Sequence, residues 1–275
     1  ICRAGYLPKL ARAALHYWEE PPISGENGSG AVFFSHCNLK CLFCQNYDIS
    51  QEYFGKEISI EHLAEIFLQL QSQGAHNINL VSPTHFMPQI REALVLAKQS
   101  GLNIPIVYNS NGYEKAEALH EYMEGLIDIY LPDLKYYSDV YSTKYSKAPH
   151  YFEYATRSVL EMYNQVGSPV FDEHGLIKKG IMIRHLMLPG LLEDSKKVLN
   201  WIKDNLPTSV YISLMAQYTP FYKANEIKEL NHTINKKQYD ALIDYFFEIG
   251  LENGYVQELS SAKDVYTPTF DLSGV

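Results

Sequence analysis

Hydrophobic positions along this chain follow two spacings, and the two alternate. Leu63, Ile66, Phe67 and Leu70 fall at i, i+3, i+4 and i+7, which places them on one face of a helix. Short apolar runs between turn residues, such as residues 31–34, are typical of buried strands. The alternation predicts strands over residues 31–34, 77–81, 104–108, 127–131, 180–188 and 210–215. It predicts further helices over residues 87–99, 114–122, 151–166 and 195–205, and a last one around Tyr239, Leu242, Ile243, Phe246 and Phe247.

The first 30 residues do not follow this alternation of strands and helices. Residues 10–17 predict a short helix, which the sequence Glu19-Glu20-Pro21-Pro22 would end because proline disfavours helix in the residue before it. Residues 24–30 are rich in glycine and serine, and we expect a loop there.

Strands that alternate with helices predict an α/β fold with a parallel sheet and helical crossovers. Six units are too few for the eightfold barrel, so we expect a partial (β/α)6 TIM-type barrel; a doubly wound sheet remains the alternative. No linker divides the chain, and a single domain is expected. Within it we expect an N-terminal segment packing on the barrel (residues 1–30), the barrel (31–250) and a C-terminal tail (251–275).

Composition narrows the class of protein. The chain has 275 residues, is 46% hydrophobic, and carries a formal charge of −9, which argues against nucleic acid as its main partner. No run of about 18 apolar residues is present, so no membrane span is expected. There are four cysteines in the whole chain, and a reduced, cytoplasmic protein is the expectation.

Three of the cysteines, Cys37, Cys41 and Cys44, are spaced C-x3-C-x2-C. Clustered thiolates suit iron–sulfur clusters and zinc. A cubane cluster usually has four cysteine ligands, so three would leave one iron open. Three alternatives stay in view: a disulfide framework, an electron-transfer protein, and a structural zinc site completed by His36 or Cys2. Cys2 is otherwise a spare thiol or the remnant of an upstream cysteine group.

Polar residues follow the predicted strands, at the edge where parallel α/β folds place their chemistry. The segments that follow or end the strands are the cysteine loop, Ser82-Pro83-Thr84-His85, Asn109-Ser110-Asn111-Gly112, Pro132-Asp133-Leu134-Lys135, Arg184-His185 and Gln217-Tyr218-Thr219-Pro220. A second metal at His76 and His85 is not expected, because the two lie at opposite ends of one strand.

The cysteine spacing, with Phe43 before the third cysteine, resembles the signature of the radical S-adenosylmethionine (SAM) enzymes. The resemblance implies a [4Fe–4S] cluster held by Cys37, Cys41 and Cys44, with SAM on the open iron. It also implies reductive cleavage of SAM to a 5′-deoxyadenosyl radical that abstracts hydrogen from a substrate.

The order of the later motifs resembles the activating enzymes of glycyl radical enzymes, such as that of pyruvate formate-lyase. The shared motifs are Asn111-Gly112, Asp133-Leu134-Lys135, Ile183-Arg184 and Pro189-Gly190. A poorly characterised family of activase homologues is still more similar. Its hallmarks are like Trp18-Glu19-Glu20-Pro21-Pro22, Gly28-Ser29-Gly30, the run from Gly74 to Leu80, Pro83-Thr84-His85 and Tyr130-Leu131-Pro132-Asp133.

The resemblance assigns SAM contacts by position. These are Phe43 and Leu186 beside the adenine, Lys135 and Arg184 on the ribose or carboxylate, and Ser82, Thr84, His85, Asn109, Asn111, Asp133 and Gln217 around the rest. Ser82 to His85 replaces the Gly-Gly-Glu that holds the SAM amino group in the superfamily, and Thr84 is the expected substitute. Asn109 stands where the activases have an aspartate, which weakens the case for a monovalent cation. For Lys135 and Arg184 the alternative role is a buried ion pair with Asp133.

By resemblance, the substrate is a glycine of a glycyl radical enzyme, and the electron comes from a flavodoxin or ferredoxin. The alternatives are a small-molecule or peptide substrate and, outside catalysis, a zinc-stabilised binding module.

Overall fold

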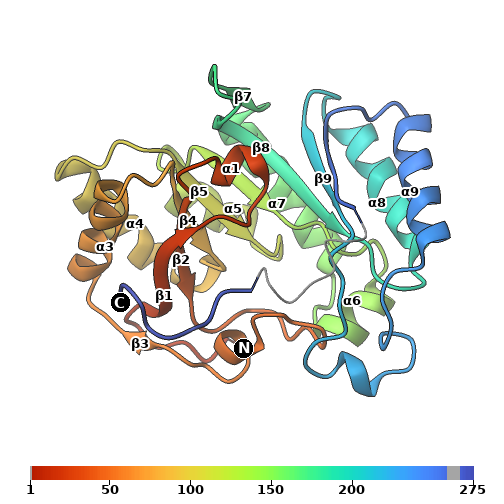
Figure 1. Cartoon of the computed structure of the whole chain (residues 1–275), viewed down its shortest axis with the longest axis horizontal. Coiled ribbons are helices and arrows are strands. Elements are labelled where there is room, and N and C mark those ends of the chain that lie inside the picture. The colour runs from red at the N-terminus through yellow and green to blue at the C-terminus, as the bar shows by residue number, and fades with distance from the viewer. Residues whose placement is uncertain (1, 259–266) are drawn as a thin grey trace.

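A computed structural model describes residues 2–258 and 267–275 (Figure 1). Within them, ten strands form one sheet in the order β10-β9-β8-β6-β5-β4-β2-β1-β3, with β7 paired to β8. The strands from β2 to β10 along this order are parallel. They are β2 (Ser29–Phe34), β4 (Ile78–Val81), β5 (Ile106–Ser110), β6 (Ile129–Pro132), β8 (Ile177–Leu186), β9 (Tyr211–Met215) and β10 (Gly254–Val256).

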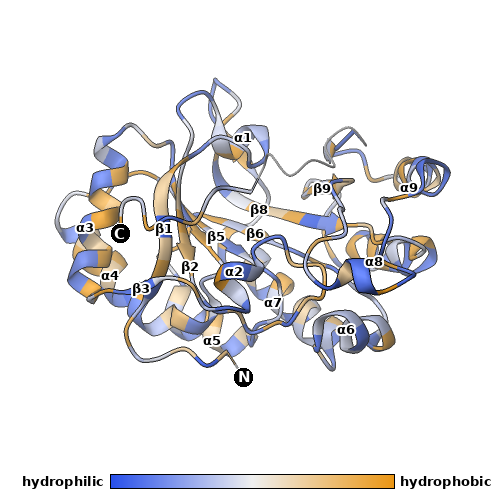
Figure 2. Ribbon diagram, turned by 60° about the horizontal axis from the view of Figure 1, so that its bottom comes forward, coloured by the Kyte–Doolittle hydropathy of each residue, from blue (hydrophilic) through white to orange (hydrophobic). Residues whose placement is uncertain are grey.

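Helices cover the outer face of this sheet (Figures 1 and 2). They are α3 (Ile60–Ser72), α4 (Met87–Gln99), α5 (Ala116–Met123), α7 (Tyr151–Val166), α8 (Leu192–Asn205) and α9 (Lys236–Glu248). Shorter helices are α1 (Pro21–Ser24), α2 (Tyr47–Ser50) and α6 (Asp139–Ser146). The expected partial TIM-type barrel is confirmed. No helix of the described residues is both long and apolar enough to cross a membrane.

Alternate residues of the strands serve two cores, as the two-residue period of a strand requires. On β5, Ile106 and Tyr108 are buried with the outer helices. Val107 faces the other way and packs in a separate cluster around Ile23 of α1. Ile23 is fully buried, so α1 plugs the concave side of the sheet. The last residues of the segment before α1 are thereby held inside the barrel.

The predicted helix over residues 10–17 is wrong. This stretch forms strand β1 (Lys9–His16), which pairs antiparallel with β2 and, at Lys9 and Leu10, with β3 (Lys56–Glu57). Alanine-rich sequence favours a helix locally, but pairing with β2 over almost its whole length buries Leu10, Ala11 and Ala13. Tertiary context of this kind overrides propensity.

Residues 267–275 return to the first strand. The backbone N–H of Leu272 donates to the Ala11 carbonyl (3.0 Å), and that of Ala13 donates to the Ser273 carbonyl (2.8 Å). Arg12 forms an ion pair with Asp271 at 2.8 Å. The segment therefore covers the part of the β1 edge that β3 leaves free. The three-residue strand β10 also lies in the region assigned to a tail, whose division from the barrel stays a prediction.

Candidate functional site

One cavity of about 240 Å³ brings most of the predicted site together. Cys37, Cys41 and Cys44 line it, and we call it the cysteine cavity. The other predicted residues on its wall are Phe43, Ser82, Asn109, Asn111, Asp133, Lys135, Arg184, Leu186 and Gln217. Each comes from the loop after β2 or from the last residues of, or the turn after, β4, β5, β6, β8 or β9. The cavity thus lies at the carboxyl ends of the parallel strands.

The cysteine loop is held against helix α6. Its backbone donates to α6, from Lys40 N to the Ser146 carbonyl (2.9 Å) and from Leu42 N to the Tyr145 carbonyl (2.8 Å). The Ser146 hydroxyl also donates to the Cys41 sulfur at 3.1 Å. These contacts tie the cysteine loop to α6, and support of this kind makes a preorganised site.

The other two thiols have polar neighbours as well. The Cys44 sulfur lies 3.2 Å from the Ser50 hydroxyl, and the Asn111 amide donates to the Cys37 sulfur at 3.5 Å. Burial raises the pKa of Cys37 to about 11 and that of Cys44 to about 12. Both are therefore protonated thiols at neutral pH, and a bound metal must displace their protons.

The residues present fit a [4Fe–4S] cluster with SAM beside it. Three thiols stand at one side of the cavity, one fewer than a complete cubane ligand set. Cations, amides and a buried aromatic ring, Phe43, line the remainder. The described residues contain no group of three or more His, Cys, Asp or Glu side chains that could hold a single metal ion. His36, proposed as a zinc ligand, instead places its Nδ1 2.9 Å from the Cys2 carbonyl.

Arg184 is the centre of a buried charge network on the cavity wall. Its Nε donates to Asp133 Oδ1 (2.9 Å), and its Nη2 donates to Asn109 Oδ1 (2.6 Å). Lys135 donates to the second oxygen of Asp133. Burial works against the Asp133 charge, but Arg184 and Lys135 together hold its pKa below the usual value. The ion pair considered for these residues is therefore present, on the wall where SAM contacts are predicted.

Glu19 completes this network, and sequence reasoning missed its role. It precedes the α1 plug and points its carboxylate at the strands. One oxygen accepts from Asn79 (3.1 Å) and Asn109 (3.2 Å), and the other accepts from Arg184 (3.3 Å). Burial raises the pKa of Glu19, an effect that Arg184 opposes. The available signal was the Trp18-Glu19-Glu20-Pro21-Pro22 motif, which was interpreted as a helix end and as a family hallmark but gave Glu19 no role in the site.

Glu20, the next residue, is buried, and one oxygen of its carboxylate is unpaired. Its exposed fraction is 7%, and its Oε2 has no hydrogen-bond partner among the described residues. Burial raises its pKa, and Arg184 is the cation that opposes this shift most strongly. Two carboxylates of one segment therefore face the same guanidinium.

Two predicted contacts lie outside the cysteine cavity. The Thr84 hydroxyl donates to Glu114 Oε1 at 2.7 Å, and Thr84 lines a different cavity of about 380 Å³. His85 places its Nε2 2.7 Å from the Ser35 carbonyl, and burial lowers its pKa to about 4. Of that turn, only Ser82 reaches the cysteine cavity, with a left-handed φ of 58°. The assignment of Thr84 and His85 to SAM stays a prediction.

The Asn111-Gly112 turn shows why its sequence is specific. Gly112 has φ 76°, and a Cβ there would lie 2.3 Å from the Asp133 carbonyl oxygen. Only glycine lets the two strand-end loops approach this closely. Tyr151 joins the same loops, since its hydroxyl lies 2.8 Å from the Asn111 carbonyl and 3.0 Å from that of Asp133. The turn thereby sets the distance between the loops after β5 and β6.

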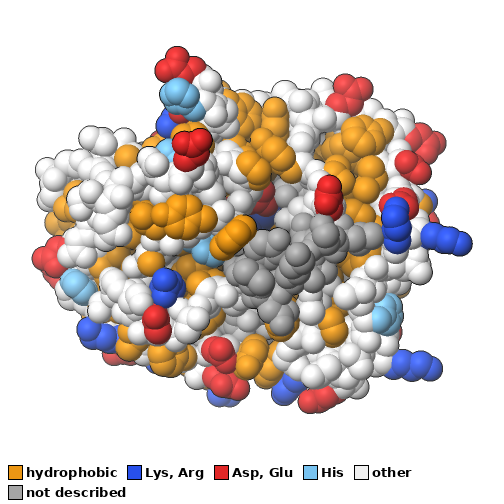
Figure 3. Space-filling model, in the orientation of Figure 1, with side chains coloured by type: hydrophobic (Ala, Val, Ile, Leu, Met, Phe, Trp, Pro, Cys, Tyr) orange, Lys and Arg blue, Asp and Glu red, His pale blue; other side chains and the backbone are white. Residues whose placement is uncertain are grey.

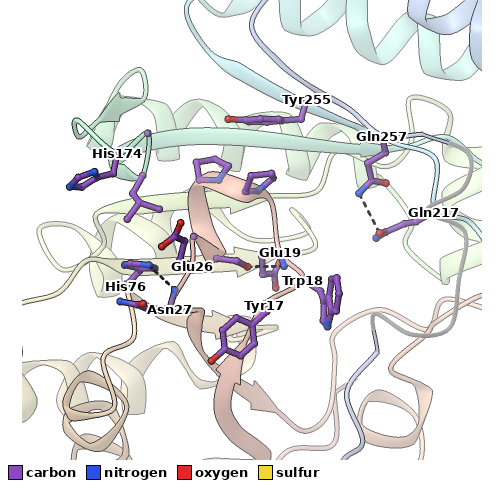
Figure 4. A pocket seen from close by; sticks show the side chains of 16 residues that line it. Tyr17, Trp18, Glu19, Glu26, Asn27, His76, His174, Gln217, Tyr255 and Gln257 are labelled. Atoms are coloured by element: carbon purple, nitrogen blue, oxygen red, sulfur yellow. Dashed lines mark hydrogen bonds between the residues drawn. The ribbon is translucent and has the colours of Figure 1, made fainter.

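A second, larger cavity of about 930 Å³ adjoins the first, and we call it the side groove. Trp18, Glu19 and Gln217 line both cavities. Figure 4 shows its lining: His76 and His174 lie at one end, and Gln217 and Gln257 at the other. The surface in Figure 3 is hollowed on this side of the molecule. The groove was not foreseen, because its walls come from segments that lie far apart in the sequence.

Comparison with known proteins gives a family. A model described as the radical SAM superfamily matches residues 31–202. An uncharacterized protein of Methanocaldococcus jannaschii is 32% identical over 227 residues, which cover 78% of this chain and 61% of that protein. The pyruvate formate-lyase-activating enzyme of Clostridium pasteurianum is 24% identical over 233 residues, covering 80% of this chain and 87% of that enzyme.

Solved structures share the fold. Streptococcus suis SuiB bound to SAM superposes with a TM-score of 0.54 and 15% identity, over 82% of this chain and 50% of that one. Methylornithine synthase gives a TM-score of 0.55 and 14% identity, over 90% and 72%. These identities are low, so the two structures support the barrel architecture alone.

Proposed function

Because this chain belongs to the radical SAM superfamily, we propose that it removes a hydrogen atom from a peptide segment of a partner protein, as an activator of a glycyl radical enzyme. Superfamily membership makes it an enzyme with a [4Fe–4S] cluster and SAM. When bound, these cofactors supply one-electron cleavage of SAM, and the resulting 5′-deoxyadenosyl radical takes the hydrogen atom. The chain's own residues have to bind, orient and enclose the reactants.

The observation that carries the proposal is the junction of the two cavities. A small molecule is usually enclosed in a closed pocket, whereas the cysteine cavity adjoins the large side groove and shares Trp18, Glu19 and Gln217 with it. Such a shape suits a chain that enters from the side. Sequence similarity to the pyruvate formate-lyase-activating enzyme of Clostridium pasteurianum supports the same proposal.

Residue roles in the proposal follow from position. Cys37, Cys41 and Cys44 would hold the cluster and leave one of its irons without a cysteine ligand. Lys135 and Arg184 would exchange part of their pairing with Asp133 for the SAM carboxylate, which keeps the buried charges compensated. A flavodoxin or ferredoxin would deliver the electron, and the cytoplasm is the proposed compartment because the thiols must stay reduced.

The test is anaerobic reconstitution followed by reduction and assay of 5′-deoxyadenosine, then paramagnetic resonance on a candidate glycyl radical enzyme mixed with the activated protein. We expect a carbon-centred radical on the partner, with one 5′-deoxyadenosine formed per radical. A Cys41→Ala variant should bind less iron and form no 5′-deoxyadenosine, whereas Cys2→Ala should behave as the parent.

Other outcomes separate the alternatives. Formation of 5′-deoxyadenosine that rises only with a small metabolite would replace the glycyl radical proposal with small-molecule chemistry. A colourless protein that retains zinc and forms no 5′-deoxyadenosine after reconstitution would leave the zinc-stabilised module.

A further inference from the structure

The side groove has an unbalanced charge. Two carboxylates, Glu19 and Glu26, line it, and no Lys or Arg of the described residues does. Lys178 lies nearby, but it is paired with Asp172 at 3.0 Å. Glu19 is committed to Arg184 at the junction, whereas Glu26 is exposed to solvent in the groove itself. The groove therefore presents one accessible negative charge.

His76 does not cancel this charge. His76 accepts a hydrogen bond at Nε2 from the backbone N–H of Asn27 (3.1 Å), so that nitrogen carries no proton. Burial lowers the pKa of His76, which favours the same neutral form. His174 lies exposed at the same end of the groove as His76 (Figure 4). Its Nε2 lies 3.7 Å from Oε1 of Glu173, which adds a further carboxylate there. The end of the groove away from the cysteines is thus neutral to negative.

Aromatic rings provide the other half of the lining. Tyr17 and Trp18 are 51% and 58% exposed, an unusual state for large rings that stand next to each other. Tyr255 of β10 faces them across the groove (Figure 4). Rings of this kind bind apolar side chains and also attract cations over their faces. Side-chain amides of Asn27 and Gln257 add donors and acceptors that suit a peptide backbone.

We propose that the side groove binds an extended peptide segment that carries a lysine or arginine side chain. The cation lies beside Glu26, apolar parts of the segment pack on Trp18 and Tyr255, and the chain leads past Gln217 to the cysteine cavity. This deepens the function proposed above and rests on it. It assigns the substrate a chemistry: a basic residue a few positions from the residue that loses hydrogen.

The probe is an end-blocked random hexapeptide pool, equilibrated at low salt with the anaerobically reconstituted, immobilised protein and quantified by mass spectrometry. Retained peptides should be enriched in Lys and Arg by about three- to fivefold, the effect of one partly exposed ion pair. Glu26→Gln should abolish the enrichment, because it removes the charge and keeps the shape. Glu92→Gln on the exposed face of α4 is the matched control and should retain it.

A second variant tests whether the peptides are retained in the groove or only by non-specific attraction to an acidic protein. Tyr255→Leu should lower retention of the whole pool while the preference for Lys and Arg remains. Equal retention of basic and neutral peptides by the parent, an unchanged preference in Glu26→Gln, or no retained peptide would each overturn the proposal.

Formation of 5′-deoxyadenosine without substrate separates this inference from the proposed function. Glu26 lies outside the cysteine cavity, so Glu26→Gln should match the parent in that assay. A parent that cleaves SAM but shows no basic preference would refute the inference alone. A parent that shows the preference but never cleaves SAM would refute the function and leave a peptide-binding groove.

Discussion

At the scale of single residues, Arg184 separates three carboxylates that would otherwise be buried together. Burial opposes its charge, yet Asp133, Glu20 and Glu19 hold its pKa above the usual value. Such a residue was predictable as a site residue because it ends a strand at the mouth of a parallel sheet. Its partner Glu19 was not predicted as a site residue, because the contact joins positions 165 residues apart in the sequence.

Removing this cation should cost much of the protein's stability. Arg184→Met leaves Asp133 and Glu19 without their shared partner, and loss of one member of a buried ion pair costs about 3–5 kcal/mol. The free energy of unfolding in urea, measured on the cluster-free protein, tests this. Arg91→Met on the exposed side of α4 is the control, and a loss no larger than the control's would contradict the role given to Arg184.

Glu114 gives a second prediction at this scale. Burial raises its pKa to about 7 from 4.5, although the Thr84 and Ser110 hydroxyls donate to it. A carboxyl group whose pKa is raised in the folded protein stabilises the fold when the pH is below the pKa of the unfolded chain. This stabilisation is lost as the pH rises through about 7, the pKa in the folded protein. Glu114→Gln should therefore unfold at the same urea concentration as the parent near pH 5 and at a higher one at pH 8.

The measurement is a series of urea midpoints between pH 5 and pH 8, with Glu92→Gln as the exposed control. Parallel curves for the parent and Glu114→Gln would show that Glu114 is ionised throughout. In Thr84→Val, the urea midpoint should fall more between pH 5 and pH 8 than it does in the parent, because the substitution removes a hydrogen-bond donor to the Glu114 carboxylate. An effect of Thr84→Val on SAM binding alone would instead support the original assignment of Thr84 to SAM.

At the scale of elements, long segments with a clear hydrophobic period were predicted well. Strands that form only by pairing with a distant segment were predicted poorly. The predicted helix over residues 87–99 has the bounds found for α4 (Met87–Gln99), because its buried face repeats over several turns. The sequence of β1 predicts a helix, because only pairing with β2 makes this segment a strand. β3, β7 and β10 have two or three residues each, too few to show a period. Pairing across the chain decides such elements.

The four-residue helix α1 fills the concave side of the sheet with Ile23, and this role can be tested. Ile23→Ala would leave a void among Val107, Ile129 and Met182, and such truncations cost about 2–5 kcal/mol. The free energy of unfolding should fall by this amount, whereas Val95→Ala on the half-exposed side of α4 should change it by less than about 0.5 kcal/mol. A cost for Ile23→Ala as small as that of Val95→Ala would mean that the plug is dispensable.

At the scale of the whole molecule, the sheet predicts where chemistry can occur but not what reacts. Six strand ends were expected to converge, and they do, because parallel strands share one carboxyl edge. The side groove escaped prediction because β10, α1 and the turn between β7 and β8 meet only in the folded chain. Substrate choice therefore depends on segments outside the regular barrel pattern.

The covered edge of β1 has a consequence for how molecules meet one another. An open strand edge is a template on which a second chain can add a strand, and such edges lead to aggregation. Here Leu272 and Ser273 occupy the backbone groups of Ala11 and Ala13 that would otherwise be offered. Trimming residues 267–275 would leave these backbone groups exposed as an edge to which a second copy of the chain can add a strand.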